Sequence, residues 1–174
     1  MPRRLAGALA ALLLAWALPA GATDLQTLRG PGWSLELPAQ WSQQKGLMGA
    51  ELVARPPKSD SAGWAQDQLI LTREPYDPRR TCLDGFVLRK LRDMGHLAED
   101  FQVVSEQPLE LGGAVASRLE LDYREGPRHL HAYLMVLATE KEMIVLSLTS
   151  EPARFEFQRA LFRRIADSLR PTAR

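Results

Sequence analysis

The sequence has little of three things that would narrow its function: cysteine, net charge and long apolar runs. Cys82 is the only cysteine among 174 residues, so an intrachain disulfide is excluded and stability has to come from packing. We expect this thiol to be buried, because free cysteine is among the most buried residue types. The alternative is a bond to a second chain.

Only one long apolar run is present, and it lies at the start of the chain. Leu5–Leu18 carries no charge, follows the basic pair Arg3-Arg4, and ends at Pro19. The next three residues, Ala20-Gly21-Ala22, form a small-x-small cleavage site. Because the run is shorter than the roughly 20 residues of a membrane-spanning helix, we expect residues 1–22 to be a cleavable secretory signal peptide.

The remaining chain, residues 23–174, has almost no charge imbalance. Without the two signal-peptide arginines it holds 20 Lys and Arg against 21 Asp and Glu, a net charge of −1. This balance gives no electrostatic reason to bind nucleic acid, and no second apolar run could form an integral membrane segment. Its length suits one domain. We therefore expect a single domain that is periplasmic or secreted.

Strand patterns dominate the mature chain, because apolar residues recur at every second position. Seven strands are predicted: Trp33–Leu37, Glu51–Arg55, Gln68–Arg73, Gln102–Leu111, Ala114–Tyr123, His129–Thr139 and Met143–Thr149. Gly112-Gly113 suits a tight hairpin, since glycine tolerates positive φ. The last two strands have apolar residues at both odd and even positions, which is typical of strands covered on both faces.

Two segments have helical periodicity instead. The first is apolar at Leu83, Val87, Leu91 and Met94, with a capping box from Thr81 to Asp84 and an end at Gly95. The second covers about Ala153–Leu169, with Ser150 as its N-cap and a buried stripe of Phe157, Leu161, Ile165 and Leu169. The predicted fold class is α+β, an antiparallel sheet of about six to seven strands sandwiched by helices on opposite faces.

Several features in order resemble the PsbP-like superfamily. They are Leu37-Pro38-Ala39-Gln40-Trp41, the Gly112-Gly113 hairpin, the strands around Glu140-Lys141-Glu142, and the ending Ile165-Ala166-Asp167-Ser168-Leu169. The resemblance covers nearly the whole mature domain and implies an antiparallel sheet between helices. Members of this superfamily, which include bacterial envelope proteins of the DcrB type, are mostly not enzymes. The resemblance therefore implies a binding or accessory role.

His129 and His131 are the candidate metal ligands. Residues i and i+2 of a strand project from the same face, about 6.5–7 Å apart, which suits two ligands of one zinc or copper ion, and Asp122 or Glu125 would add an oxygen. The alternative interpretation is a polar outer face near a strand end. Apart from this metal, the sequence predicts no cofactor.

Candidate partner-binding residues lie on the last helix and in one loop. Arg159, Arg163 and Arg170 align on the helix face away from Phe157 and Leu161, where they form either a solvated surface or a docking face for an acidic partner. Trp64 lies in a small polar loop, and exposed tryptophans often mark contact sites.

The sequence contains no strong catalytic signature. It has no Gly-x-Ser-x-Gly, no His-Glu-x-x-His and no phosphate-binding glycine loop, and nothing distinguishes Glu120 and Asp122 from a solvated edge. The leading hypothesis is therefore a non-enzymatic envelope accessory protein that binds a protein partner. The runner-up is a periplasmic carrier of a lipid or hydrophobic small molecule, which requires an apolar cavity. A metal-dependent enzyme using His129 and His131 comes third.

Overall fold

Long strands joined by tight turns form the centre of the molecule, as the alternating pattern predicts. The computed structural model describes residues 24–57 and 67–172. The described elements, in chain order, are β1 (Leu25–Gly30), β2 (Trp33–Pro38), β3 (Ser42–Gln44), a 3₁₀ turn (Leu47–Gly49), β4 (Leu52–Arg55), β5 (Gln68–Pro75), α1 (Leu83–Leu97), β6 (Glu99–Leu111), β7 (Ala114–Glu125), β8 (Arg128–Ala138), β9 (Glu142–Ser150), α2 (Pro152–Asp167) and β10 (Arg170–Pro171).

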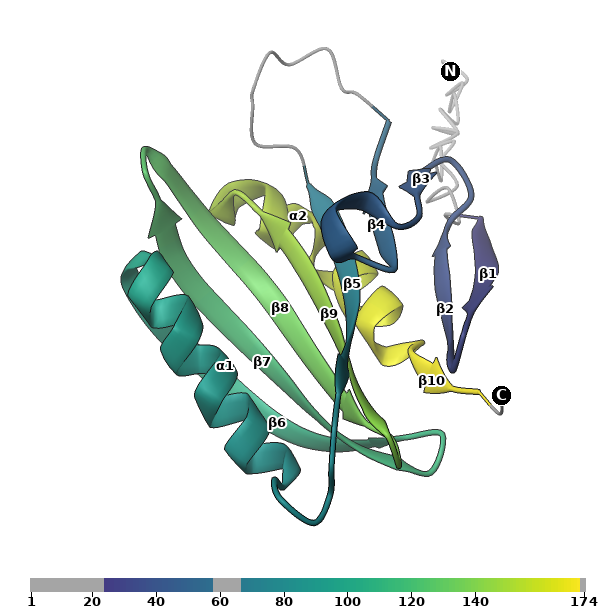
Figure 1. Cartoon of the computed structure of the whole chain (residues 1–174). Coiled ribbons are helices and arrows are strands. Elements are labelled where there is room, and N and C mark those ends of the chain that lie inside the picture. Colours follow the sequence, from purple (N-terminus) through teal and green to yellow (C-terminus); the bar gives the residue numbers. More distant parts are fainter. Residues whose placement is uncertain (1–23, 58–66, 173–174) are drawn as a thin grey trace, which may run out of the picture.

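The strands form two antiparallel sheets. The large sheet has seven strands in the order β3-β4-β5-β9-β8-β7-β6, and the small one has the order β1-β2-β10 (Figure 1). The predicted α+β class, with a sheet of six to seven strands between helices, is confirmed. One strand assignment needs correction: the strand at Trp33–Leu37 belongs to the small sheet, and the short β3 takes the seventh place in the large sheet.

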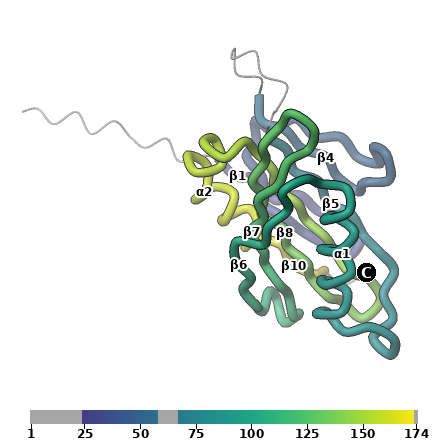
Figure 2. Tube along the Cα trace, turned by 90° about the vertical axis from the view of Figure 1, so that its left-hand side faces the viewer, coloured from purple at the N-terminus to yellow at the C-terminus, as the bar shows by residue number. Residues whose placement is uncertain are grey.

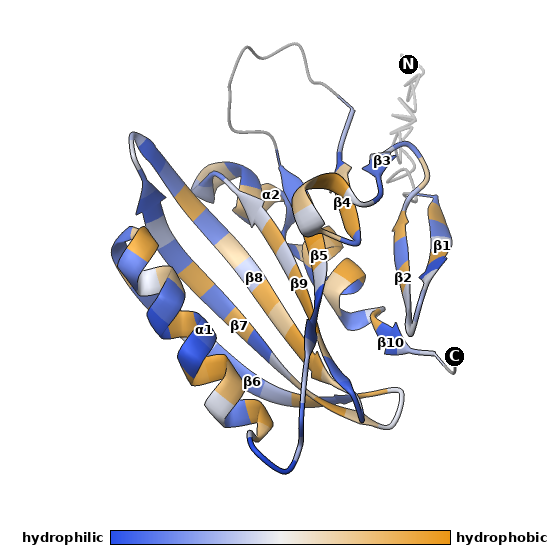
Figure 3. Cartoon of the chain, viewed as in Figure 1, coloured by the Kyte–Doolittle hydropathy of each residue, from blue (hydrophilic) through white to orange (hydrophobic). Residues whose placement is uncertain are grey.

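The two helices cover opposite faces of the large sheet (Figure 2), and β8 shows why both faces are apolar. Met135 belongs to the core that Phe162 of α2 helps to form. Its neighbour Val136 points the other way, into the core that contains Phe86 of α1. Hydropathy colouring accordingly shows apolar residues along the middle of β8 and β9 (Figure 3). Each large side chain buried in this way contributes about 1.5–3 kcal/mol.

The start of α1 corrects two expectations. Cys82, rather than Thr81, is the N-cap residue, and its sulfur accepts a hydrogen bond from the backbone N–H of Gly85 at 3.4 Å. The thiol is exposed, so the expected burial is wrong. An N-cap residue precedes the first helical turn, outside the apolar stripe that packs on the sheet. The helix also continues past Gly95 and ends at Leu97.

The buried stripe of α2 differs from the predicted one. Phe155, Phe162 and Ile165 are fully buried, whereas Phe157 is 91% exposed. At 3.6 residues per turn, Phe157 lies about 200° around the helix from Phe155, so only one of the two can face the sheet. The predicted burial of Phe157 is therefore wrong, while that of Ile165 and Leu169 is confirmed.

The predicted hairpin at Gly112-Gly113 is confirmed, and it also contacts β10 near the end of the described chain. Both glycines have positive φ, 60° and 81°, as in the hairpin turns of primed type. A Cβ on Gly112 would lie 2.9 Å from Cδ of Arg170 and 3.1 Å from Cδ of Pro171. Glycine is therefore required at position 112 for both its conformation and its contact with β10.

Two predicted features lie outside the described residues: the signal peptide, residues 1–22, and the candidate contact residue Trp64. Within residues 24–57 and 67–172, neither helix is both long and apolar enough to cross a lipid bilayer.

Candidate functional site

A pocket of about 570 Å³ lies between α2 and the strands β6, β7 and β8. α2 packs mainly on β8 and β9, and the pocket lies to the side of that contact, toward β6. The lining side chains include Ser105, Gln107, Arg118, Glu120, Tyr133 and Arg159. Most of them are polar or charged, so this pocket differs from an apolar cavity.

The floor of the pocket is charged because β7 alternates charged with apolar residues. Leu119 and Leu121 pack in the core on the α1 side. The residues that alternate with them along β7 point to the opposite face, where Arg118 and Glu120 line the pocket. The sequence pattern did not distinguish Glu120 from a solvated edge. Its side chain is in fact largely covered, because Arg159 of α2 lies over it.

Arg159 is held by acceptors on every side. One terminal nitrogen, Nη1, donates to Glu120 at 2.9 Å and to the Tyr133 hydroxyl at 3.1 Å. The other, Nη2, donates to Glu120 at 2.8 Å and to Glu156 at 2.5 Å, and Nε donates to Glu156 at 3.0 Å. All five N–H groups of the guanidinium therefore have partners within the chain.

The histidine pair lies beside this cluster, joined to it by carboxylates. His131 Nε2 is 2.7 Å from Glu120 and its Nδ1 is 3.0 Å from Asp122. His129 Nε2 is 2.7 Å from the second oxygen of Asp122. Carboxylates only accept hydrogen bonds, so the two bonds of His131 form together only when both of its ring nitrogens carry hydrogen. The His131 ring also packs on Phe155, with 4.4 Å between ring centroids.

These contacts change the pKa values of the acidic groups. Hydrogen bonding from Arg159, followed by that from His131, lowers the pKa of Glu120 against the opposing effect of burial. For Asp122, burial acts to raise the pKa, but hydrogen bonds from His129 and His131 outweigh it and the net pKa is lowered. Both carboxyl groups are therefore stabilised in their charged form.

The structure bears on the metal hypothesis through the neighbours of the two histidines. Asp122, which was predicted to supply an oxygen ligand to the metal, contacts both His129 and His131. Within residues 24–57 and 67–172, no group of three or more His, Cys, Asp and Glu side chains has an arrangement that could hold a metal ion. Metal binding at His129 and His131 stays a prediction of the sequence.

A second ion cluster forms the far wall of the pocket. Arg118 is 7% exposed and donates to Asp167 of α2 and, at 2.6 Å, to Gln107. Arg163 is exposed and reaches the same Asp167 at 3.7 Å. Arg163 and Phe157 line the same pocket.

Arg170, the third predicted arginine, lies elsewhere. It belongs to β10 beyond the end of α2, where its side chain donates to the backbone oxygens of Asp167 and Leu169 at 2.6 and 2.8 Å. It lines a separate pocket with Glu36 and Ser168. The predicted set of partner-binding arginines is therefore divided between two places on the surface.

Sequence reasoning missed a buried acid at the start of β5. Asp67 is fully buried, pairs with Arg154 at 3.0 Å and accepts hydrogen bonds from Ser150 and Gln158. Ser150 was predicted to cap α2, but the N-cap residue is Glu151. The chain offers no local signal for Asp67, because its partners come from β9 and α2.

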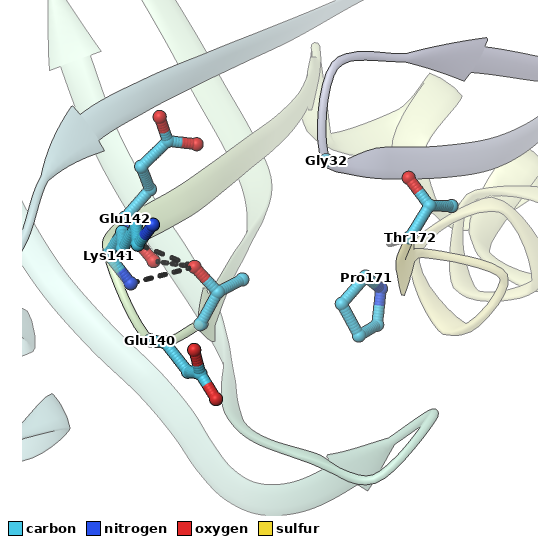
Figure 4. A pocket seen from close by; sticks show the side chains of 7 residues that line it. Gly32, Glu140, Lys141, Glu142, Pro171 and Thr172 are labelled. Carbon is cyan, nitrogen blue, oxygen red and sulfur yellow. Dashed lines mark hydrogen bonds between the residues drawn. The ribbon is translucent and has the colours of Figure 1, made fainter. Parts of the chain in front are cut away.

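Two further pockets share the turn between β8 and β9. One, of about 300 Å³, lies between the Glu140-Lys141-Glu142 turn and Pro171 and Thr172 of the C-terminal segment (Figure 4). The other, of about 560 Å³, is mostly apolar and is lined by Tyr76, Val115 and Pro171 among others. The second is the better place for an apolar ligand.

Comparisons with known proteins support the family resemblance. The DcrB family model matches residues 33–168, which is most of the chain. No curated protein matches the chain in sequence.

Solved structures give the fold. The solution structure of cyanobacterial PsbP (CyanoP) from Synechocystis sp. PCC 6803 has a TM-score of 0.66 and 16% identity, covering 91% of this chain and 99% of its own. PA94 of Pseudomonas aeruginosa, a protein of unknown function and putative regulator, has a TM-score of 0.61 and 17% identity, covering 86% and 99%. LpqN of Mycobacterium tuberculosis, involved in cell envelope biogenesis, has a TM-score of 0.61 and 14% identity, covering 86% and 91%. The fold is therefore PsbP-like.

Proposed function

Because the chain belongs to the DcrB family, we propose that it is an exported envelope accessory protein, without catalytic activity, that binds a protein partner through the outer face of α2. The predicted signal peptide supports export. LpqN, which shares the fold, is a protein involved in cell envelope biogenesis, and this supports the proposed location.

The observation that carries the proposal is the exposure of Phe157. This side chain is 91% exposed in the middle of α2. Ala153 and Ala160, one turn before and one turn after it, are exposed too. Aromatic residues, phenylalanine among them, are enriched at protein interfaces relative to the rest of the surface. The face therefore offers one large apolar anchor on a rigid helix.

Charge indicates what kind of partner fits this face. Arg163 and Arg164 are both exposed on the next turn of α2, and arginine is enriched at interfaces together with aromatic residues. We expect the partner to present an acidic patch beside an apolar pocket that receives Phe157, which keeps the predicted role of Arg163.

The absence of catalysis is part of the proposal, and the geometry of His131 supports it. A general base needs a free nitrogen within reach of a substrate. Both ring nitrogens of His131 are within 3.0 Å of carboxylate oxygens, and Glu120, which lines the pocket, is bound by Arg159.

The test is recovery of the partner from the native envelope at a fixed stoichiometry. We expect wild-type protein to co-purify with one envelope protein that rebinds when both are purified, and Phe157→Ala to reduce that binding at least tenfold. Leu88→Ala is the matched control, because Leu88 is 68% exposed on α1, on the other side of the sheet. Recovery of free protein alone, or equal loss of binding in both variants, would refute the proposal.

A second candidate is the carrier of a hydrophobic small molecule. The mostly apolar groove of about 560 Å³ beside Tyr76 and Val115 favours it. Mass spectrometry of organic extracts from native protein tests this function: a Val115→Trp variant should lose a ligand that a Leu88→Trp control retains.

A further inference from the structure

We propose that the pocket between α2 and β6–β7 is a ligand site for a carboxylate carried on an apolar body. This inference goes beyond the proposed partner, which contacts the outer face of α2. It rests on the charges, the unused hydrogen-bond donors and the shape of the pocket wall.

The charges of the pocket are unevenly distributed between its two sides. Arg159 lies between Glu120 and Glu156 and uses all five of its N–H groups on those two carboxylates and Tyr133. The two glutamates are thus already engaged. One arginine against two glutamates leaves this side of the pocket with one negative charge in excess, so excess positive charge can lie only on the side of the other two lining arginines, Arg118 and Arg163.

Arg118 and Arg163 share a single carboxylate. Both reach Asp167, and no other carboxylate of the described residues 24–57 and 67–172 lies within ion-pair distance of either. Arg118 is nearly buried, so water compensates its charge poorly. The wall of the pocket therefore carries an excess positive charge at a place where an anion would be dehydrated on binding.

Donors for an anion are present on the same wall. Arg118 uses one N–H of each terminal nitrogen, on Asp167 and Gln107, and keeps three N–H groups. The Tyr133 hydroxyl accepts from Arg159, which leaves its own O–H free to donate. Ser105, which lines the pocket, makes no side-chain hydrogen bond within the described part of the chain.

The shape of the site selects the kind of anion. Arginine presents a planar fork that matches a carboxylate. Phe157 and Ala160 form an apolar side of the same pocket, next to the charged wall. A volume of about 570 Å³ is within the range of small-molecule sites. The ligand class is therefore an aromatic or aliphatic carboxylic acid, or the acidic side chain of a peptide next to an apolar residue.

Titration of the full mature protein with 4-phenylbutyrate, followed by backbone amide NMR, tests the proposal. We expect saturable shifts at residues 105, 107, 118 and 157–160, and at least tenfold weaker binding of the neutral analogue 4-phenylbutanol. Equal binding of acid and alcohol would contradict the charge argument. Equal binding of inorganic phosphate would contradict the need for an apolar body.

Two variants locate the binding. Arg118→Gln should weaken 4-phenylbutyrate binding at least tenfold. Since Arg118 is nearly buried and its loss could unfold the chain, Ser105→Trp is a second variant that fills the pocket from an exposed strand. Val103→Trp, also at an exposed position on β6, is its control and should bind normally. Unchanged binding in Ser105→Trp would overturn the proposal.

A capped peptide with adjacent Phe and Glu distinguishes the two sources of the carboxylate. Binding of the peptide at least tenfold tighter than that of 4-phenylbutyrate would show that the natural ligand of the pocket is a polypeptide. Tighter binding of 4-phenylbutyrate would show a small-molecule site. The partner test above uses Phe157→Ala, so failure of this titration leaves the proposed function standing.

Discussion

Asp67 and Arg154, which are 87 positions apart in the chain, form an ion pair at 3.0 Å in which the carboxylate is completely buried. Ser150 and Gln158 donate further hydrogen bonds to the same carboxylate. This cluster ties the start of β5 to the end of β9 and the first turns of α2. Three segments that are distant in sequence therefore depend on one acidic side chain.

Replacing Asp67 should be among the most destabilising single changes. Asp67→Ala leaves the half-buried Arg154 and two polar groups without their acceptor, and a buried polar group left without its partner costs about 1–3 kcal/mol. Urea denaturation measures the loss. The control is Asp93→Ala, whose exposed carboxylate has Arg92 as its one ion-pair partner among the described residues; this change should cost less than about 0.5 kcal/mol. Similar effects of the two changes would contradict this account.

Two phenylalanines of α2 provide a matched pair. Phe162 is fully buried between Trp41 and Phe155, so Phe162→Ala should lower the free energy of unfolding by about 3–5 kcal/mol. Phe157→Ala should change it by less than about 0.5 kcal/mol, because the exposed ring loses almost no packing. Chemical denaturation of both variants checks the orientation of the helix, and a reversed order would show that α2 is rotated.

Acid should weaken the pocket cluster. The pKa of Glu120 and that of Asp122 are lowered in the folded protein, so their contribution to stability is complete above the unfolded pKa of about 4 and is lost as pH falls through the folded pKa. The melting temperature should therefore fall steeply below about pH 4. Glu120→Gln should cost about 1–3 kcal/mol at pH 7 and show a shallower decline in acid.

The control for this pH dependence is Glu110→Gln. Glu110 is exposed on β6 and forms no ion pair with any described residue. Its variant should follow the wild-type melting curve from pH 7 to pH 3. A Glu120→Gln variant with an unchanged acid profile would argue against a role of the cluster in stability.

The thiol of Cys82 should react in the folded state. Because it is exposed at the N-cap of α1, one equivalent should react with a chromogenic disulfide reagent before any denaturant is added. Cys82→Ser should raise stability by roughly 0.5–1 kcal/mol, since serine is a better N-cap residue. A thiol that reacts only after unfolding would restore the expectation of burial.

The apolar pattern was sufficient to predict β7, which alternates, and β8 and β9, which have apolar residues at both odd and even positions because both of their faces are buried. β1, β3 and β10 were missed. β3 is the polar tripeptide Ser42–Gln44 and β10 has two residues, so neither is long enough to show a period. Such strands form because a neighbouring strand is already in place, and that information is absent from a local window.

The site shows a similar limit. The sequence placed His129 and His131 on one face and grouped Arg159 with Arg163, and the structure keeps both relations. The sequence could not show that Arg159 lies over Glu120, since this contact depends on how α2 is rotated about its own axis. Two apolar stripes compete on α2, one with Phe155 and one with Phe157, and the shape of the sheet decides between them.

The pairing of β10 with β2 has a consequence for the order of synthesis. Ser34 lies opposite Arg170, and Trp33 opposite Pro171, so residues near the two ends of the described chain meet in one small sheet. Because synthesis begins at the N-terminus, Trp33 lacks its partner strand until β10 has been synthesised. The small sheet can therefore be completed only after residues 170 and 171 have been made, 132 positions beyond the end of β2 at Pro38.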